Sequence, residues 1–309
     1  MSFLRRLVGG PPAPPWASFM RGDEYRAFMA ALGDHFAARG QRFRVEGDGL
    51  YVESPSGGEE TYGLSNLAQL CHQLDRADWP LAIETHFRNL EEASTSDVDL
   101  ADPEVARPYL KARVYRRSDM PPDAVTGLVT MPLTADLVGV LVYDLPTSVR
   151  TVSRDTARDW PDAVDRLFAI ALEHLSAEVG TYERARIELE TGGTVTGLSA
   201  PSFFVASQVL RLGDELSDAP NGALVAMPNR HGLFWHPIVA AAPTLAAVRA
   251  LLPIAHRLHE DGPGSLTPEL HWWHRGALTP LPSRIDGTRI EFAPPDAFTQ
   301  LLRSLGDAS

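Results

Sequence analysis

Hydrophobic residues along the chain follow two periods, helical and extended, in alternating blocks. The first block predicts a helix over residues 23–36, whose apolar side chains recur at helical spacing. A hairpin follows, with its turn at Gly47-Asp48-Gly49, where Asp-Gly supplies positive φ. Ser65 can cap a second helix, and Asp78-Trp79-Pro80 opens a third. The pattern therefore predicts a unit of helix, hairpin and helices over residues 21–92.

Strands dominate the next part of the chain. The run from Val138 to Tyr143 is continuously apolar, which is typical of a strand buried on both faces. Asp159-Trp160-Pro161 then opens a long helix, with Val164 on its inward side. The predicted strands lie at 110–115, 128–132, 137–144 and 148–152. Asp-Trp-Pro occurs twice in the chain, so a duplicated unit and two independent helix starts both remain open.

The last part of the chain interleaves strands and helices again. Ser199 or Ser202 can cap a helix that contains Phe203 and Phe204. A hairpin is predicted around the turn Pro228–Gly232, with Gly232 at positive φ. The remaining elements are strands at 187–190, 223–227, 233–237, 271–275, 278–281 and 288–292, a helix at 245–258 interrupted at Pro253, and a helix at 296–305.

These blocks predict an α+β fold of repeated hairpin-plus-helix units, with largely antiparallel or mixed sheets. Residues 1–20 are expected to form a flexible Pro-rich tail, because four prolines in five positions exclude a helix. Residues 93–104 are acidic and short of large apolar side chains, which indicates an exposed linker. The main α+β domain is predicted over residues 105–305.

Composition narrows the classes of function. The 309-residue chain has a net charge of −12, and this acidic balance argues against a nucleic-acid partner. No apolar run approaches the ~20 residues that cross a bilayer, so no membrane contact is expected and a cytoplasmic setting is the default. Cys71 is the single cysteine, which excludes an intrachain disulfide and a multi-thiolate zinc site. Lys111 is the single lysine and has no glycine loop beside it, which excludes a P-loop, while Schiff-base chemistry is not expected.

Candidate ligand-binding residues gather at the last hairpin. Asn229, Arg230 and His231 occupy its turn, which is expected to project beyond the sheet end, and His236 lies on the return strand. Arg230 can hold a carboxylate or phosphate. No catalytic residue, metal ligand or cofactor is predicted. Ser199 lies in a sequence similar to the G-x-S-x-G nucleophile motif, but Pro201 replaces its second glycine. The spacings of the histidines match no metal-binding signature.

The sequence thus favours a module that binds a protein or small-molecule partner without chemistry of its own. The alternative is a metal-dependent hydrolase that uses His231 and His236 with an acidic residue from elsewhere. Whether the protein is an enzyme stays open at this point, because catalytic residues need not be close in sequence.

Three regions carry a family resemblance. They are RVYRRSD with LVGVLVYDLPTSVRTV, then IELETGGTVTGLSAPSFFVASQVL with GALVAMPNRHGLFW, and finally ELHWWHRGALTPLP. Across most of residues 41–282 the chain resembles the bacterial family known as domain of unknown function 1444. The resemblance implies a similar fold and a cytoplasmic setting, and it carries over no catalytic residue.

Overall fold

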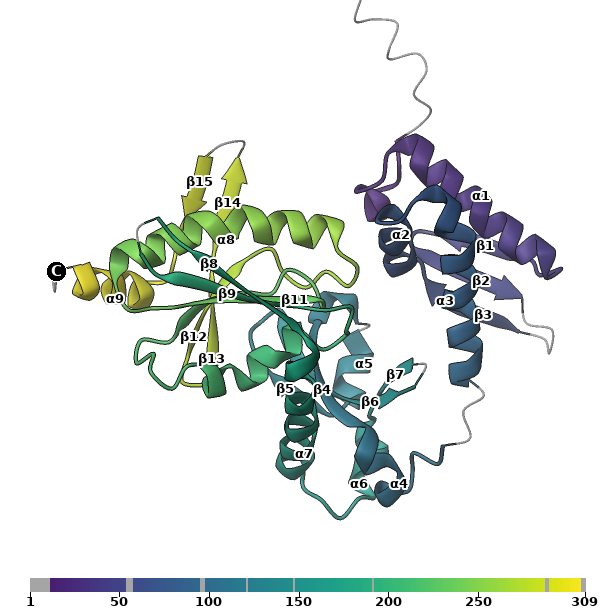
Figure 1. The fold of residues 1–309 in the computed structure, drawn as a ribbon. Helices are drawn as coiled ribbons and strands as arrows, with labels where there is room; N and C mark the ends of the chain where they lie inside the picture. Colours follow the sequence, from purple (N-terminus) through teal and green to yellow (C-terminus); the bar gives the residue numbers. More distant parts are fainter. Residues whose placement is uncertain are drawn as a thin grey trace, which may run out of the picture. The chain divides into compact units, whose positions relative to one another are not determined.

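The computed structural model describes residues 12–53, 58–94, 98–120, 122–146, 148–190, 192–286 and 289–306. Helices alternate with antiparallel sheets in this part of the chain, which confirms the α+β class (Figure 1). The chain divides into two compact units. The first unit is Met1–Ser96 with Asp261–Pro263, and the second is Asp97–Glu260 with Gly264–Ser309. No helix of the described residues is long and apolar enough to span a membrane.

The first unit packs three helices against a small sheet. Phe43 pairs with Val52 in the sheet, as the predicted hairpin requires, and a third strand extends it in the order β1-β2-β3. That third strand was not predicted, because its residues are mostly polar and exposed. The elements are α1 (Gly22–Ala38), β1 (Phe43–Glu46), β2 (Gly49–Glu53), β3 (Glu59–Gly63), α2 (Ser65–His72), η3 (Arg76–Asp78) and α3 (Trp79–Ser94).

The predicted flexible tail is wrong for its described residues, 12–20. A short helix, η2 (Pro15–Ala17), follows the prolines. Ala17 is 0% exposed and Met20 is 4% exposed, because both side chains enter the core of the first unit. The prolines exclude a regular α-helix but leave the following apolar side chains free to pack. Residues 1–11 lie outside the described residues.

The second unit begins at the predicted acidic linker. Asp102 caps the short helix α4 (Pro103–Ala106) by accepting a hydrogen bond from the Glu104 amide at 2.9 Å. The first sheet then forms in the order β4-β6-β5, with β7 also paired to β6. Its central strand is buried along almost its whole length, as the apolar run predicts. The strands are β4 (Leu110–Arg116), β5 (Thr130–Pro132), β6 (Leu137–Leu145) and β7 (Ser148–Thr151).

The helix α7 (Val164–Ala177) packs on this first sheet. The prediction that Asp159-Trp160-Pro161 opens this helix is wrong, because α7 begins only at Val164, and Val164 is exposed instead of inward. Trp160 is buried and donates a hydrogen bond from Nε1 to the Ala101 carbonyl at 3.1 Å. The short elements around it are η4 (Arg107–Tyr109), η5 (Arg117–Asp119), α5 (Pro122–Gly127), α6 (Arg154–Arg158) and η6 (Val179–Thr181).

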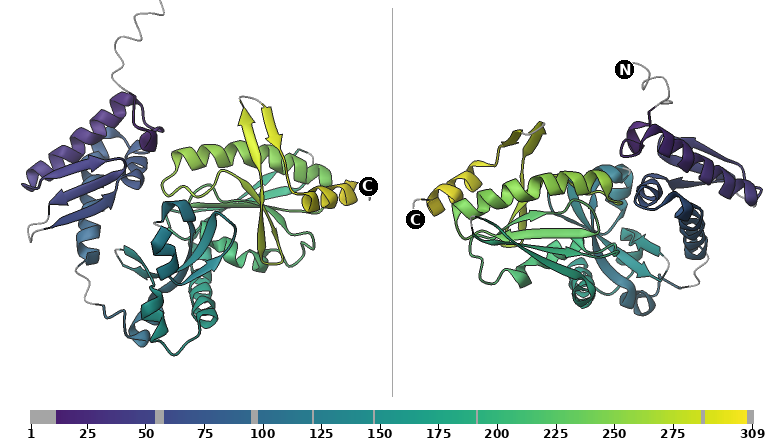
Figure 2. Two further views of the ribbon diagram at one scale, coloured as in Figure 1. Left: turned by 180° about the vertical axis from the view of Figure 1, so that it is seen from behind. Right: turned by 45° about the horizontal axis from the view of Figure 1, so that its top comes forward.

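The second sheet has six antiparallel strands in the order β13-β12-β10-β11-β9-β8. The helix α8 (Ala241–Asp261) crosses one face, and η7 (Ala206–Glu215) lies on the other (Figures 1 and 2). The strands are β8 (Glu183–Glu188), β9 (Thr194–Ser199), β10 (Ala223–Ala226), β11 (Gly232–Pro237), β12 (Leu270–His274) and β13 (Ala277–Leu281). The hairpin β14 (Ser283–Asp286) and β15 (Arg289–Phe292) and the helix α9 (Asp296–Gly306) complete the unit.

Three local predictions for this region are wrong. The helix predicted to break at Pro253 continues through it, because its apolar face packs on the sheet on both sides of the proline. The helix predicted after Ser202 begins only at Ala206 and is a 3-10 helix. Gly232 is not among the glycines with positive φ, since it is already the first residue of an extended strand.

Burial removes the single thiol from solvent. Cys71 is 0% exposed in the core of the first unit, and desolvation raises its pKa to about 12. A buried thiol that stays protonated reacts slowly with disulfide reagents. We expect native protein at pH 8 to leave Cys71 unmodified by Ellman's reagent, and protein in guanidinium chloride to react with one equivalent. Rapid stoichiometric reaction of the native protein would contradict this packing.

The close approach of β10 and β12 depends on Gly222. This residue has φ +76°, and a Cβ atom there would lie 1.9 Å from the Trp273 carbonyl oxygen. Gly276 has a similar φ of +83° with nothing within 4 Å, so it is a matched control. We expect Gly276→Ala to lower the free energy of unfolding by ~1–2 kcal/mol through backbone strain alone. Gly222→Ala should cost a further ~1–3 kcal/mol by overpacking, measured by urea denaturation. Equal losses would contradict the clash.

Candidate functional site

Hydrogen bonds from the Asn229 side chain and from the backbone hold the turn between β10 and β11 against neighbouring segments. The Asn229 side chain is 6% exposed and donates from Nδ2 to the Leu258 carbonyl at 2.9 Å. Its Oδ1 accepts a hydrogen bond from the His231 amide at 2.9 Å. The Arg230 amide donates to the Gly264 carbonyl at 3.0 Å. The turn lies at the end of β10 and β11, and neighbouring segments satisfy its polar groups.

His231 links the turn to the segment before η7. A carbonyl oxygen only accepts, so the 2.9 Å contact between Nδ1 and the Ser202 carbonyl means that Nδ1 carries the proton. Nε2 is then free to accept a hydrogen bond from Arg230 Nε at 3.0 Å. Burial, followed by the positive charge of Arg230, lowers the pKa of His231 to about 4. The imidazole is therefore neutral at pH 7, and both of its nitrogens are occupied.

Two arginine side chains meet on the ring of Phe203. The Arg230 guanidinium carbon lies 4.4 Å from the ring centroid, and that of Arg113 lies 5.2 Å from it. Arg113 belongs to β4, and its guanidinium also lies over the Tyr115 ring at 4.4 Å. Burial and the charge of Arg113 both lower the pKa of Arg230. We call Arg113 and Arg230 the arginine pair.

Neither member of the arginine pair is neutralised within the part of the chain that the structure describes. No aspartate or glutamate there forms a salt bridge with Arg113 or Arg230. The Nε atom of Arg113 is buried without a hydrogen-bond partner. Buried polar groups normally have partners, so an unpaired guanidinium nitrogen points to a binding role.

A glycine makes room for the stem of Arg230. Gly264 has φ +71°, and a Cβ atom there would lie 2.5 Å from Arg230 Cδ. The site therefore combines a hydrogen-bonded turn, the neutral His231 imidazole that accepts from Arg230 Nε, and Gly264, which leaves room for the methylene groups of Arg230. These contacts fix the direction of the guanidinium before any ligand arrives.

The C-terminal part of α8 adds two further basic side chains near this turn. Asn229 is bonded to Leu258, which lies between His256 and His259. The Nε2 atoms of both histidines are buried without a hydrogen-bond partner in the described residues. Burial, then the charges of Arg116 and His256, lowers the pKa of His259 to about 4. The surroundings of the turn thus contain arginines and histidines, and the pKa is lowered for His231 and His259.

The fourth predicted site residue, His236, lies elsewhere. It follows His231 by five residues along an extended strand, which separates their backbones by ~16 Å. Its Nδ1 donates to the Thr194 carbonyl at 3.0 Å, and it is 1% exposed. One metal ion therefore cannot be held by both histidines. The described residues contain no group of three or more His, Cys, Asp or Glu side chains placed to hold a metal ion.

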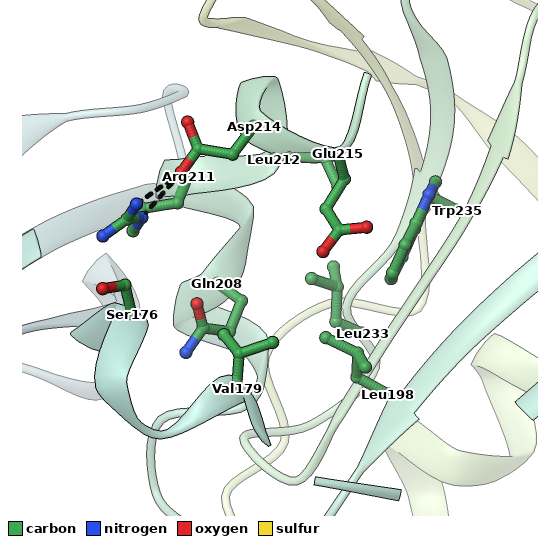
Figure 3. Close-up of a pocket in the computed structure, with 10 residues that line it drawn as sticks. All are labelled: Ser176, Val179, Leu198, Gln208, Arg211, Leu212, Asp214, Glu215, Leu233 and Trp235. Carbon is green, nitrogen blue, oxygen red and sulfur yellow. Dashed lines mark hydrogen bonds and ion pairs between the residues drawn. The ribbon is translucent and has the colours of Figure 1, made fainter. Parts of the chain in front are cut away.

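A separate cavity of about 200 Å³ opens between α7, η7 and the second sheet (Figure 3). Its floor is apolar, with Leu198, Leu212 and Leu233, and Trp235 forms one wall. The other lining residues are Ser176, Val179, Gln208, Arg211, Asp214 and Glu215.

The charged groups of this cavity are already paired. Arg211 Nη2 contacts Asp214 at 2.5 Å (Figure 3). Glu215 accepts two hydrogen bonds from Arg184, at 2.9 and 2.7 Å, which lower its pKa. The surface of this cavity that has no internal partner is therefore apolar. The arginine pair, in contrast, has charge without a carboxylate partner among the described residues.

Lys111, on the same strand β4 as Arg113, is a cation with carboxylate partners. Its Nζ contacts Asp144 at 2.7 Å and also Glu178, and it lies over the Phe204 ring at 4.7 Å. Arg113, two residues later on the same strand, contacts aromatic rings and no carboxylate. The difference marks Arg113 as the functional candidate.

Sequence reasoning placed Asn229, Arg230 and His231 together but missed Arg113 and Phe203. Alternation along residues 111–115 could have put Arg113 on the same face as Lys111 and Tyr115. Nothing in the sequence indicates that this face meets a turn more than one hundred residues later.

No family model, curated protein or solved structure matches this chain. The resemblance to the domain of unknown function 1444 family accordingly stays an expectation from the sequence. The candidate site stands on its geometry alone.

Buried neutral histidines give the stability of this unit a defined pH dependence. His231, His259 and His271 each have a pKa of about 4 in the folded protein, mainly because burial disfavours their charged form. The ordinary histidine value is ~6.5, so between these values the unfolded chain binds more protons. We expect the free energy of unfolding to fall as the pH is lowered from 7 to 5, and His231→Gln to reduce the slope. Urea denaturation at each pH measures this, and constant stability would contradict it.

Proposed function

We propose that this protein is a binding module that holds an anionic group, a carboxylate or a phosphate, on the arginine pair. The observation that carries the proposal is the meeting of two guanidinium groups on Phe203 without an acidic partner in the described residues. The proposal needs no catalytic residue. It retains three of the four ligand-binding residues expected from the sequence and adds Arg113.

Electrostatics favours an anion at this position. The two guanidinium carbons share one ring and lie within about 10 Å of each other. At an effective dielectric constant near 20, their repulsion is on the order of 1–2 kcal/mol. A bound anion replaces this repulsion by two attractions. The positive site is local, because the chain as a whole has a net charge of −12.

The geometry favours recognition of a planar or tetrahedral oxyanion. The Arg230 Nε hydrogen is used by His231, which leaves the terminal nitrogens of the guanidinium for a ligand. Guanidinium groups pair with carboxylate and phosphate oxygens through parallel hydrogen bonds. Phe203, the ring that both arginines contact, is 39% exposed, so a ligand with an apolar part next to its anionic group fits best.

The proposal can be tested with two simple oxyanions. We expect isothermal titration calorimetry to detect saturable binding of inorganic phosphate or citrate at low ionic strength. Arg113→Gln and Arg230→Ala should each weaken binding by ~10-fold or more, because each removes charge-assisted hydrogen bonds of ~1.5–3 kcal/mol. Arg166→Ala is the matched control, because Arg166 is exposed on α7 and loses the same charge.

The variants also separate recognition from folding. Arg230→Lys keeps the charge but loses the fork and the hydrogen bond to His231, so it should stay folded and bind citrate more weakly than the wild type. Circular dichroism checks that each variant is folded. Absence of saturable binding to both probes, or equal binding by the wild type and both arginine variants, would overturn the proposal.

A further inference from the structure

The second sheet ends in an edge strand whose residues are all exposed. β8 is the last strand of the order β13-β12-β10-β11-β9-β8, and among the described residues it pairs only with β9. All six of its residues, Glu183–Glu188, are exposed. The outer edge of such a strand presents backbone amide and carbonyl groups that can pair with another strand.

One face of this edge carries charged side chains of both signs, Arg184, Arg186 and Glu188. Arg186 and Glu188 point to the same side, because residues two apart in a strand share a face. Arg184 lies on that face too and is already bonded to Glu215. Arg186 forms no hydrogen bond or salt bridge among the described residues, and Glu188 accepts only from the Thr194 hydroxyl, at 3.1 and 3.0 Å.

The other face of the edge is apolar. Ala185 and Ile187 alternate there and are followed by Leu189, on the side of the sheet that α8 covers. Ile187 is 47% exposed, and Leu245 of α8 is 42% exposed next to a groove that Leu189 also lines. An exposed edge with one charged and one apolar face is suited to a strand with the same two faces.

We propose that two copies of this chain associate through β8, with the two strands antiparallel and centred on Ile187. In that register Arg186 of each copy lies opposite Glu188 of the other, and the two Ile187 side chains meet on the apolar face. Within strand residues 186–188, every residue pair across the junction is then either oppositely charged or apolar.

The neighbouring registers are less favourable. A pairing centred on Arg186 places the two Arg186 side chains directly opposite each other. A pairing centred on Ala185 places Arg184 opposite Arg186. Like charges directly opposite each other are destabilising. Charge complementarity therefore selects the register centred on Ile187, and a second copy as the occupant, because the strand is complementary to itself.

Charge substitutions test both the association and its register. We expect sedimentation equilibrium to show a reversible dimer of the full chain that weakens as salt is added. Arg186→Glu and Glu188→Arg should each weaken the dimer by at least ~10-fold, because each places like charges opposite each other at two positions. The double variant R186E/E188R restores complementarity and should dimerise like the wild type.

Mixing the two single variants gives the sharpest test. Arg186→Glu carries two acids and Glu188→Arg carries two bases at the paired positions, so an equimolar mixture should form a heterodimer although neither variant dimerises well alone. Arg166→Glu and Glu173→Arg on α7 change the net charge equally and should leave the dimer unaffected. A wild-type chain that stays monomeric at ~200 µM, well above the concentrations at which specific dimers form, would overturn the proposal. A dimer that is insensitive to the β8 variants, or a mixture that fails to associate, would do so too.

Discussion

The burial of β10 on both faces is the constraint on which the second unit depends. All four residues of Ala223–Ala226 are buried, with alternate side chains entering opposite hydrophobic clusters. A strand of this kind is stable only when both faces of its sheet are covered. The helix α8 covers one face and η7 covers the other. The close approach at Gly222 and the turn that carries Arg230 are consequences of the same central strand, because they lie at its two ends.

The described residues contain cations that are paired with carboxylates and cations that are not. Lys111, Arg184 and Arg211 are each bonded to carboxylates, so their burial is compensated. Arg113 and Arg230 are partly buried against aromatic rings, with no salt bridge to an acid in the described residues to compensate them. In an acidic protein such an arrangement costs free energy in the unliganded state. Functional sites are where costs of this kind are commonly retained.

His231 and His236 act in this fold as neutral hydrogen-bonding groups. His231 and His236 each donate from Nδ1 to a backbone carbonyl, and burial lowers the pKa of both. The proton on Nδ1 of His231 determines that Nε2 accepts from Arg230. The His231 imidazole thus orients the Arg230 guanidinium, and it has no free nitrogen for a metal ion.

The sequence by itself determined the α+β class, the two hairpins, the buried β6 strand and the group Asn229, Arg230 and His231. Local periodicity and turn chemistry specify these features, because they depend on residues close together in the chain. Tertiary structure alone decided that Asn229 is buried against α8, that α8 continues through Pro253, and that Arg113 reaches Phe203. The physical reason is that an unneutralised charge, a fixed tautomer and an unpaired strand edge depend on which residues are neighbours in space, and packing brings together residues that are far apart in the chain, such as Arg113 and Arg230.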